Sequence, residues 1–172
     1  RQIHLIDKTK KLLIKKKYTK YFGLSIYDQN EYFSLSKIIK PRIVQLPFSV
    51  VDCSEKKIKF IKYLRKKKIK VQARSIFLQG ILINELPKKM RKDKKILKFK
   101  FNYEKFCKNN NISKLNLSLN YVMNKKYFES ILIGILSFPQ LKKILNVKNN
   151  NTIKVKFNLP KNFLRIDLWK KK

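Results

Sequence analysis

The sequence predicts an α+β fold, a ferredoxin-like split βαβ sheet with two helices on one face, a long basic hairpin, and basic N- and C-terminal extensions. Two observations lead to this prediction. Apolar and polar residues alternate in 95–103, 115–121 and 153–159, which is the pattern of strands with one buried face. In 55–68 and 124–137 the apolar residues instead recur at helical spacing. The expected sheet has one apolar face and one face rich in lysine and asparagine.

The chain of 172 residues is long enough for one domain with a hydrophobic core and two extensions. We expect a basic and aromatic N-terminal extension over 1–40, an α+β domain over 41–160, and a basic C-terminal tail over 161–172. The first 20 residues are either a flexible tail or an arm that becomes ordered on phosphate groups. The aromatic residues of 18–40 favour packing against the domain or a neighbouring protein.

The domain is expected to begin with a strand over 42–51, at a sheet edge or a bulge, because Pro47 cannot donate a hydrogen bond. Asp52 and Glu55 have the spacing of a capping box, which predicts that a helix follows. The buried stripe of this helix consists of Ile58, Ile61 and Leu64. The lysines on its opposite face are either solvated or in contact with phosphate.

A second extended strand, 69–83, is joined by the basic tip 88–95 to the alternating strand 95–103, which makes a long hairpin. The other two alternating segments and the second helix complete the domain, with a turn that begins at Pro139. The aromatic side chains of the alternating strands fall on the apolar phase. We therefore expect them in the core rather than as a platform on which bases stack.

The chain has 44 Lys and Arg residues against 10 Asp and Glu residues, a formal net charge of +34. A compact domain with this charge repels itself, so a polyanionic partner is expected. Nucleic acid is the expected polyanion, because each lysine that neutralises a phosphate releases counterions and gains affinity without reading base sequence. The predicted RNA-binding residues are Lys88, Lys89, Arg91, Lys92, Lys94, Lys95, Lys98, Lys100, Lys66, Lys67, Lys68, Lys15, Lys16, Lys17, Lys170 and Lys171.

The sequence contains no nucleotide-binding, metalloprotease or nucleophile-elbow motif. Cys53 and Cys107 lack CxxC spacing and His4 is the single histidine, so no metal site is expected. Asp52 and Glu55 are the closest carboxylate pair, and helix capping accounts for them. We therefore expect no enzyme, no catalytic residues, no cofactor and no small-molecule substrate. The apolar runs are too short for a membrane-spanning helix, so no membrane insertion is expected.

Six pieces of the sequence carry a resemblance to a known family. In chain order they read RIVQLPFSVVD, EKKIKFIKYLRKKK, ELPKKMRKDKKILKFKFN, KLNLSLNYV, KKYFESILIGIL and TIKVKFNL. Their order, with the Leu86-Pro87 step before Lys88, resembles the small-subunit ribosomal protein ten family over about two thirds of the chain. The resemblance implies a place in the head of the small ribosomal subunit, with the hairpin between ribosomal RNA and neighbouring ribosomal proteins.

The predicted function is that of a structural constituent of the mitochondrial ribosome, in the small subunit, which binds rRNA through lysine–phosphate contacts. Residues with GC-rich codons are depleted, with Ala73 the single alanine, which is typical of an AT-rich genome and favours an organellar, mitochondrial matrix location. One alternative is a large-subunit ribosomal protein. Another is a basic soluble subunit of a different organellar complex, bound to acidic proteins or anionic lipid. A subunit of an RNA-processing enzyme would need a carboxylate or histidine cluster that the sequence does not show.

Overall fold

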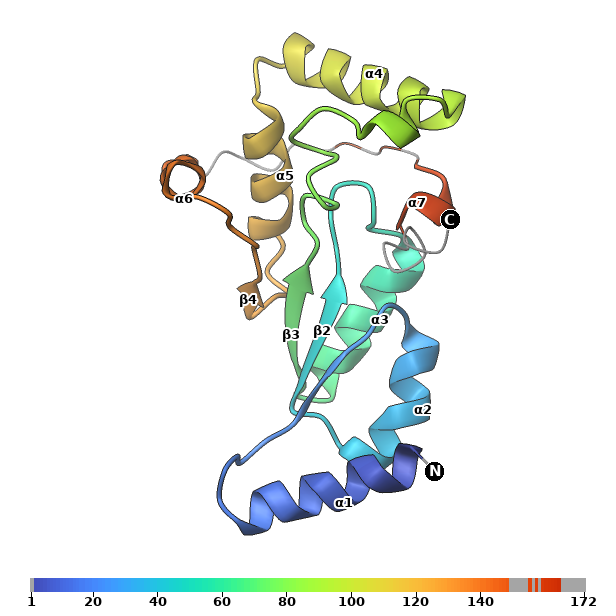
Figure 1. Ribbon diagram of the computed structural model, residues 1–172, viewed down its shortest axis with the longest axis vertical. Coiled ribbons are helices and arrows are strands. Elements are labelled where there is room, and N and C mark those ends of the chain that lie inside the picture. Colours follow the sequence, from blue (N-terminus) through green and yellow to red (C-terminus); the bar gives the residue numbers. More distant parts are fainter. Residues whose placement is uncertain (1, 149–154, 156, 158, 165–172) are drawn as a thin grey trace. The chain divides into compact units, whose positions relative to one another are not determined.

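A computed structural model describes residues 2–148, 155, 157 and 159–164 of the chain (Figure 1). In chain order its elements are α1 (Gln2–Lys15), β1 (Gly23–Ser25), α2 (Gln29–Ile39), β2 (Ile43–Pro47), α3 (Glu55–Lys66), β3 (Lys70–Arg74), the 3₁₀ helix η1 (Lys88–Met90), α4 (Lys94–Asn109), α5 (Lys114–Met123), β4 (Ser130–Ile131), α6 (Phe138–Leu145) and α7 (Lys161–Leu164). The chain divides into two compact units. Unit 1 comprises Arg1–Pro47, Ser54–Ala73 and Tyr127–Ser130, and unit 2 comprises Phe48–Cys53, Arg74–Lys126 and Ile131–Lys172.

The strands form one four-stranded sheet in the order β1-β2-β3-β4. The strands β1 and β2 are parallel, with Gly23 opposite Ile43 and Ser25 opposite Gln45. Figure 1 shows β2 and β3 pointing in the same direction as well. Parallel neighbours need a crossover connection, and α2 and α3 supply it between the first three strands. Unit 1 is therefore a repeated strand–helix–strand arrangement.

Short polar side chains start both crossover helices. The carboxylate of Asp28 accepts hydrogen bonds from the backbone N–H groups of Asn30 and Glu31, at 2.8 and 3.2 Å, and so caps α2. The hydroxyl of Ser54 accepts from the N–H of Lys57 and caps α3. The sequence correctly predicts α3, but the capping residue is Ser54 rather than Asp52.

The core of unit 1 lies between one face of the sheet and the crossover helices. Buried residues alternate along the strands and are Leu24 in β1, Val44 and Leu46 in β2, and Val71 and Ala73 in β3. On α3 the buried residues are Phe60, Ile61 and Leu64, and on α2 they are Tyr32 and Ile39. The rings of Tyr32 and Phe60 meet edge to face at 5.4 Å, which joins the two helices. The predicted strand 42–51 is confirmed only over Ile43–Pro47, and it lies between two neighbours rather than at a sheet edge. In the following helix Ile61 and Leu64 are buried as predicted, whereas Ile58 is half-buried.

An added methyl group at Gly23 tests the close contact between β1 and β2. A Cβ at this position would collide with Cγ2 of Ile43 and lie 3.0 Å from the Ile43 carbonyl oxygen. We expect Gly23→Ala to lower the free energy of unfolding by about 1–2 kcal/mol, because the packed strands have to move apart. Gly134→Ala is the control, since its Cβ would meet no atom within 4 Å. Urea unfolding measures both variants, and equal midpoints would contradict the contact.

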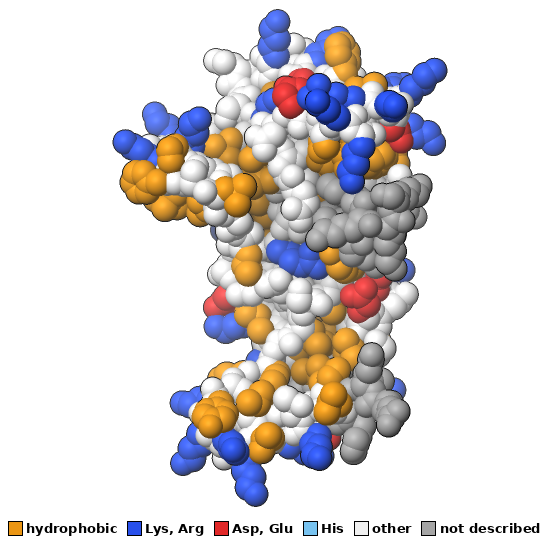
Figure 2. All heavy atoms as spheres, in the orientation of Figure 1, with side chains coloured by type: hydrophobic (Ala, Val, Ile, Leu, Met, Phe, Trp, Pro, Cys, Tyr) orange, Lys and Arg blue, Asp and Glu red, His pale blue; other side chains and the backbone are white. Residues whose placement is uncertain are grey.

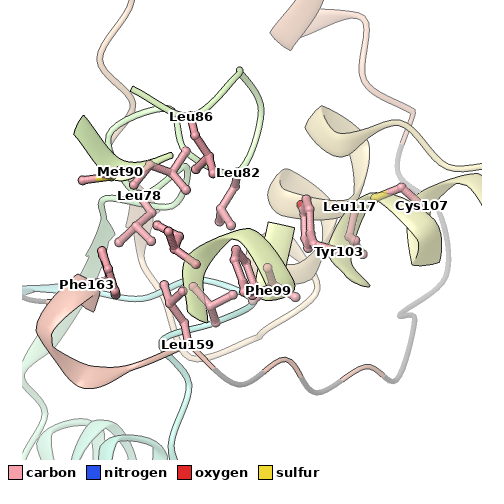
Figure 3. Close-up of a cluster of buried hydrophobic side chains, with 14 residues drawn as sticks. Leu78, Leu82, Leu86, Met90, Phe99, Tyr103, Cys107, Leu117, Leu159 and Phe163 are labelled. Atoms are coloured by element: carbon pink, nitrogen blue, oxygen red, sulfur yellow. The ribbon is translucent and has the colours of Figure 1, made fainter. Parts of the chain in front are cut away.

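Unit 2 has its own core, in which α4 and α5 supply most of the helical side chains (Figure 3). Asp93 caps α4 by accepting from the N–H groups of Lys95 and Ile96, and Ser113 caps α5. The buried residues of α4 are Ile96, Phe99, Lys100, Tyr103 and Cys107, which recur at the helical spacing of three and four. The hydroxyl groups of Tyr103 and Ser118 form a buried hydrogen bond of 2.9 Å between the two helices.

The prediction of a ferredoxin-like antiparallel sheet is wrong. The segment 95–103 lies in α4 and the segment 115–121 in α5, so two of the three alternating strands are helices. The predicted helix 124–137 contains β4 and irregular chain instead, and a helix begins only at Phe138. In the alternating segment 153–159, residues 153, 154, 156 and 158 lie outside the described residues.

The predicted long basic hairpin is also absent from the described chain. The extended segment ends with β3 at Arg74, and the residues that follow form successive turns. Gly80 has a φ of 86°, which a glycine adopts readily. The basic segment 88–95 contains η1 and the start of α4, so it connects turns to a helix rather than two strands.

Candidate functional site

A row of polar side chains crosses the sheet of unit 1 on the face opposite its buried residues. Because successive side chains of a strand point to opposite faces, Gln45 lies opposite Val44 and Leu46, and Gln72 lies opposite Val71 and Ala73. We call the four residues Ser25, Gln45, Gln72 and Ser130 the polar row. Each strand of the sheet contributes one of them.

Hydrogen bonds join the polar row in pairs. The hydroxyl of Ser25 donates to Oε1 of Gln45 at 3.1 Å, between β1 and β2. The amide of Gln72 donates to Oγ of Ser130 at 2.9 Å, between β3 and β4. Beside the second pair, Nζ of Lys70 lies 2.7 Å from the carboxylate of Glu129, and both side chains are more than half exposed. An exposed ion pair of this kind adds little to stability. The direction in which the polar row faces is therefore set mainly by the strands that carry it.

A cavity of about 210 Å³ lies at the C-terminal ends of β1 and β2, where α2 and α3 begin. It is lined by Ile26, Tyr27, Asp28, Gln29, Asn30, Leu46, Ser54, Lys56, Lys57 and Phe60. Nζ of Lys57 donates to the carbonyl of Pro47 at 3.1 Å, which holds this lysine against the end of β2. The cavity is smaller than the roughly 300–1,000 Å³ typical of drug-sized ligands. It therefore suits at most a small group, and no residue of the polar row lines it.

The described groups with the clearest pKa shifts lie in unit 2, and packing explains them. Burial raises the pKa of the Tyr103 hydroxyl well above its usual value, so this tyrosine stays protonated. Burial lowers the pKa of Lys100, whose Nζ donates to the carbonyl groups of Ile81 and Asn84 at 2.9 and 2.5 Å. These groups hold helices and turns together rather than surround an open site.

The chemistry available to the polar row is binding and orientation. Hydroxyl and carboxamide groups both donate and accept hydrogen bonds, and none of them changes charge near neutral pH. The row can therefore recognise a small polar group but cannot itself serve as an acid or a base. Among the described residues, no group of three or more His, Cys, Asp and Glu side chains could hold a metal ion.

The predicted RNA-binding residues that the structure describes are divided between the two units. Lys15, Lys16, Lys17, Lys66, Lys67 and Lys68 are exposed at the ends of α1 and α3 in unit 1, and Lys88, Lys89, Arg91, Lys92, Lys94, Lys95 and Lys98 are exposed around η1 and α4 in unit 2. Lys100 is buried, with 5% of its surface exposed. Lys170 and Lys171 lie outside the described residues. The predicted face of Lys98 and Lys100 does not exist, because a helix turns these two side chains in different directions.

Sequence reasoning missed the polar row. The available signal was the single glutamine inside each of two otherwise apolar or alternating strands, Gln45 in RIVQLPFSVV and Gln72 in KVQARS. A polar residue on the open face of a strand is ordinary in a half-exposed sheet, so the pattern alone carried no functional meaning. The parallel pairing gives it meaning, because it aligns Ser25 with Gln45.

The comparisons with known proteins agree with the parallel arrangement. Residues 8–158 match the aldo/keto reductase family. The apo form of the aldo-keto reductase AKR11C1 from Bacillus halodurans is similar at 13% identity and a TM-score of 0.64, over 86% of this chain and 52% of that one. Its holo form is similar at 12% identity and a TM-score of 0.62, over 86% and 50%. The glycerol dehydrogenase AKR11B4 from Gluconobacter oxydans has 14% identity and a TM-score of 0.49, over 87% and 57%. The comparison with curated proteins found no match.

These matches overturn the predicted identity. The chain spans about half the length of the solved structures that it matches. The fold that they share is a barrel-like arrangement of parallel strands and helices, not a ferredoxin-like sheet. The predictions of a ribosomal structural protein, of rRNA and ribosomal proteins as partners, and of a non-enzyme are therefore wrong. The chain belongs to the aldo/keto reductase family.

Proposed function

We propose that this protein takes part in an oxidoreductase reaction that uses NAD(P)H and a small carbonyl or alcohol substrate, and that its sheet binds part of the cofactor. The family match over residues 8–158 supports the class of reaction. Active sites of (βα)₈ barrels lie at the C-terminal ends of the strands, and Ser25 is the last residue of β1. The hydrogen-bonded pair of Ser25 and Gln45 at this end of the sheet is the observation that carries the proposal.

The donor set of this pair fits the carboxamide of a nicotinamide ring. A carboxamide offers an N–H₂ donor and a carbonyl acceptor, and Gln45 offers the complementary acceptor and donor in one side chain. The hydroxyl of Ser25 holds Oε1 of Gln45 at 3.1 Å and so fixes which end of the amide faces outward. The bound cofactor supplies hydride transfer, while these residues bind and orient its ring.

The reaction also needs a proton donor near the substrate carbonyl, and the polar row supplies none. The proton must come from another residue of the assembled site or from water. The division of labour we propose is that this chain binds and orients the cofactor, while residues that complete the barrel handle the proton.

The direct test uses the protein purified from cells that express its whole gene. We expect reduced nicotinamide cofactor to bind, and its absorbance to fall when aldehydes or ketones are added. Absence of binding by both NADH and NADPH, together with absence of turnover across a panel of carbonyl compounds, would refute the proposal.

Microscopy of the tagged protein tests the mitochondrial location, which stays a prediction from composition.

Gln45→Leu tests the assigned contact. We expect the affinity for the reduced cofactor to fall by about tenfold, which corresponds to about 1.4 kcal/mol, because the substituted side chain cannot hydrogen-bond the carboxamide. Fluorescence titration measures the dissociation constant. Lys62→Met is the control, since Lys62 is exposed on α3 and should leave the affinity unchanged. An unchanged affinity in both variants, with an unchanged melting temperature, would remove Gln45 from the site.

A further inference from the structure

The solvent face of α4 carries cationic and apolar side chains together. Positions of a helix that recur at spacings of three and four residues lie on one face. On the side of α4 opposite its buried residues, these positions are occupied by exposed side chains, which are Lys94, Leu97, Lys98, Phe101, Lys105 and Lys108. We call this set the cationic face. Figure 2 shows Lys and Arg side chains around the place that α4 occupies in Figure 1.

The acidic residues of α4 and its cap are engaged elsewhere. Asp93 accepts hydrogen bonds from two N–H groups of the first turn and caps the helix. The carboxylate of Glu104 lies 3.4 Å from Nζ of the buried Lys100 and 2.9 Å from Nζ of Lys114. Among the residues that the structure describes, the four lysines of the cationic face form no ion pair. Their charge is therefore available to an external anion.

Two apolar side chains project between these lysines. Phe101 is 66% exposed and Leu97 is 42% exposed, and their spacing of four residues places them side by side. The helix α3 provides a contrast, because an aromatic residue there also lies among exposed lysines. Tyr63 is only 38% exposed, and its ring stacks on that of Phe60 at 6.4 Å. The ring of Phe101 is thus more available than that of Tyr63 to a surface that covers its helix.

The composition of the cationic face favours a membrane surface over a protein partner. Lysine is depleted at protein interfaces, and the strongest contacts there are aromatic or arginine anchors that fill a pocket. A bilayer needs no matching shape. Anionic headgroups attract lysines, while an aromatic ring enters the boundary between the headgroups and the acyl chains. Lysine side chains are also long enough to keep their ammonium groups among the headgroups.

We propose that the cationic face binds the surface of a membrane rich in anionic phospholipid. In the bound state Phe101 and Leu97 lie in the headgroup boundary, and the four lysines lie among the anionic groups of the lipids. The proposal concerns where the protein binds rather than the reaction that it catalyses, and it does not depend on the proposed function. Its consequence is a protein that collects at anionic membranes and is released as the ionic strength rises.

Vesicle sedimentation of the protein expressed from its whole gene tests the proposal. We expect binding to phosphatidylcholine vesicles that contain about 30% phosphatidylserine, and none to phosphatidylcholine alone. A triple variant of the cationic face should lower the partition coefficient by at least about tenfold, because each lysine near an anionic surface contributes about fivefold; it consists of Lys94→Gln, Lys98→Gln and Lys105→Gln. The control removes the same charge from exposed positions of α3 and should have less than about a twofold effect; it consists of Lys59→Gln, Lys62→Gln and Lys66→Gln.

Phe101→Ala tests the apolar part of the contact. We expect the partition coefficient to fall by at least about fivefold, and this ratio to persist at raised salt, whereas the effect of the lysine variant shrinks as charges are screened. Equal losses from both lysine variants, with no effect of Phe101→Ala, would show attraction by net charge alone and overturn the proposal. Absence of binding to the anionic vesicles would also overturn it and leave an acidic protein as the partner.

Unchanged melting temperatures show that the variants remain folded. The residues replaced are exposed, so the core of unit 2 keeps its packing. Vesicle binding is measured without cofactor or turnover, so failure here is distinguishable from failure of the proposed activity.

Discussion

Phe99→Ala is expected to lower the free energy of unfolding by about 3–5 kcal/mol, whereas Phe101→Ala should change it by less than about 0.5 kcal/mol. The ring of Phe99 is 4% exposed, and its centroid lies 5.8 Å from that of Tyr103 and 6.3 Å from that of Phe157. Phe101 is 66% exposed. Removing the first ring leaves a cavity in the core of unit 2, while removing the second leaves the core intact.

This pair of variants distinguishes a helix from a strand because the two residues are two positions apart in the sequence. In a strand, residues two apart lie on the same face, and both truncations would be costly. In a helix they lie about 200° apart, so one is buried and the other exposed. Urea unfolding followed by circular dichroism gives both free energies. Similar losses of unfolding free energy in the two variants would indicate a strand over 95–103 and contradict α4.

Lys100→Met is expected to destabilise the protein by about 3 kcal/mol at neutral pH. Nζ of Lys100 donates to the carbonyl groups of Ile81 and Asn84 and lies 3.4 Å from the carboxylate of Glu104. Methionine fills a similar volume but leaves the two carbonyl groups without this donor, and hydrogen bonds from charged groups contribute about 1.5–3 kcal/mol. Lys98→Met, at an exposed position of the same helix, is the control and should have no measurable effect.

The pH dependence gives an independent readout of the same lysine. Burial lowers the pKa of Lys100 below 10.5, so between the folded pKa and 10.5 the unfolded chain binds more protons than the folded chain. The contribution of this residue to stability therefore rises as pH rises through that window. Below the window, the folded chain carries the full cost of burying the charged ammonium group. We expect the stability of the native protein relative to Lys100→Met to increase from neutral pH toward 10.5. A stability difference that stays constant or falls over this pH range would show that burial does not determine the pKa of Lys100.

The structure confirms those parts of the sequence prediction in which one pattern admits one interpretation. The strand predicted over 42–51 appears over a shorter range as β2, and the helix that contains Ile58, Ile61 and Leu64 appears as α3. The prediction for the segment KILKFKFNY is wrong because its apolar residues fit both the helical period and the strand period. Ile96, Phe99 and Tyr103 recur at helical spacing, while Leu97, Phe99, Phe101 and Tyr103 alternate. The Asp93 cap was the local signal for the helix, and a short apolar run does not settle the choice.

The candidate site was less accessible from the sequence than the fold. Ser25 and Gln45 are 20 positions apart, and neither belongs to a motif. Their meeting depends on a parallel register that places Ser25 opposite Gln45, which no local pattern specifies. The burial of Lys100 is likewise decided by turns 16 and 19 residues away, whose carbonyl groups accept its hydrogen bonds.

The sequence by itself determined the net charge of +34 and the uncharged segments around β1 and before Lys142. The net charge led us to predict a polyanionic partner. Composition shows how strongly a protein attracts anions, but it does not show which surface or which fold carries the charge. Only the tertiary structure decided that the strands are parallel, that α4 is a helix, and that Gln45 faces away from the core. The physical reason is that burial and strand pairing join residues far apart in the chain, and these contacts override local preferences that are nearly balanced.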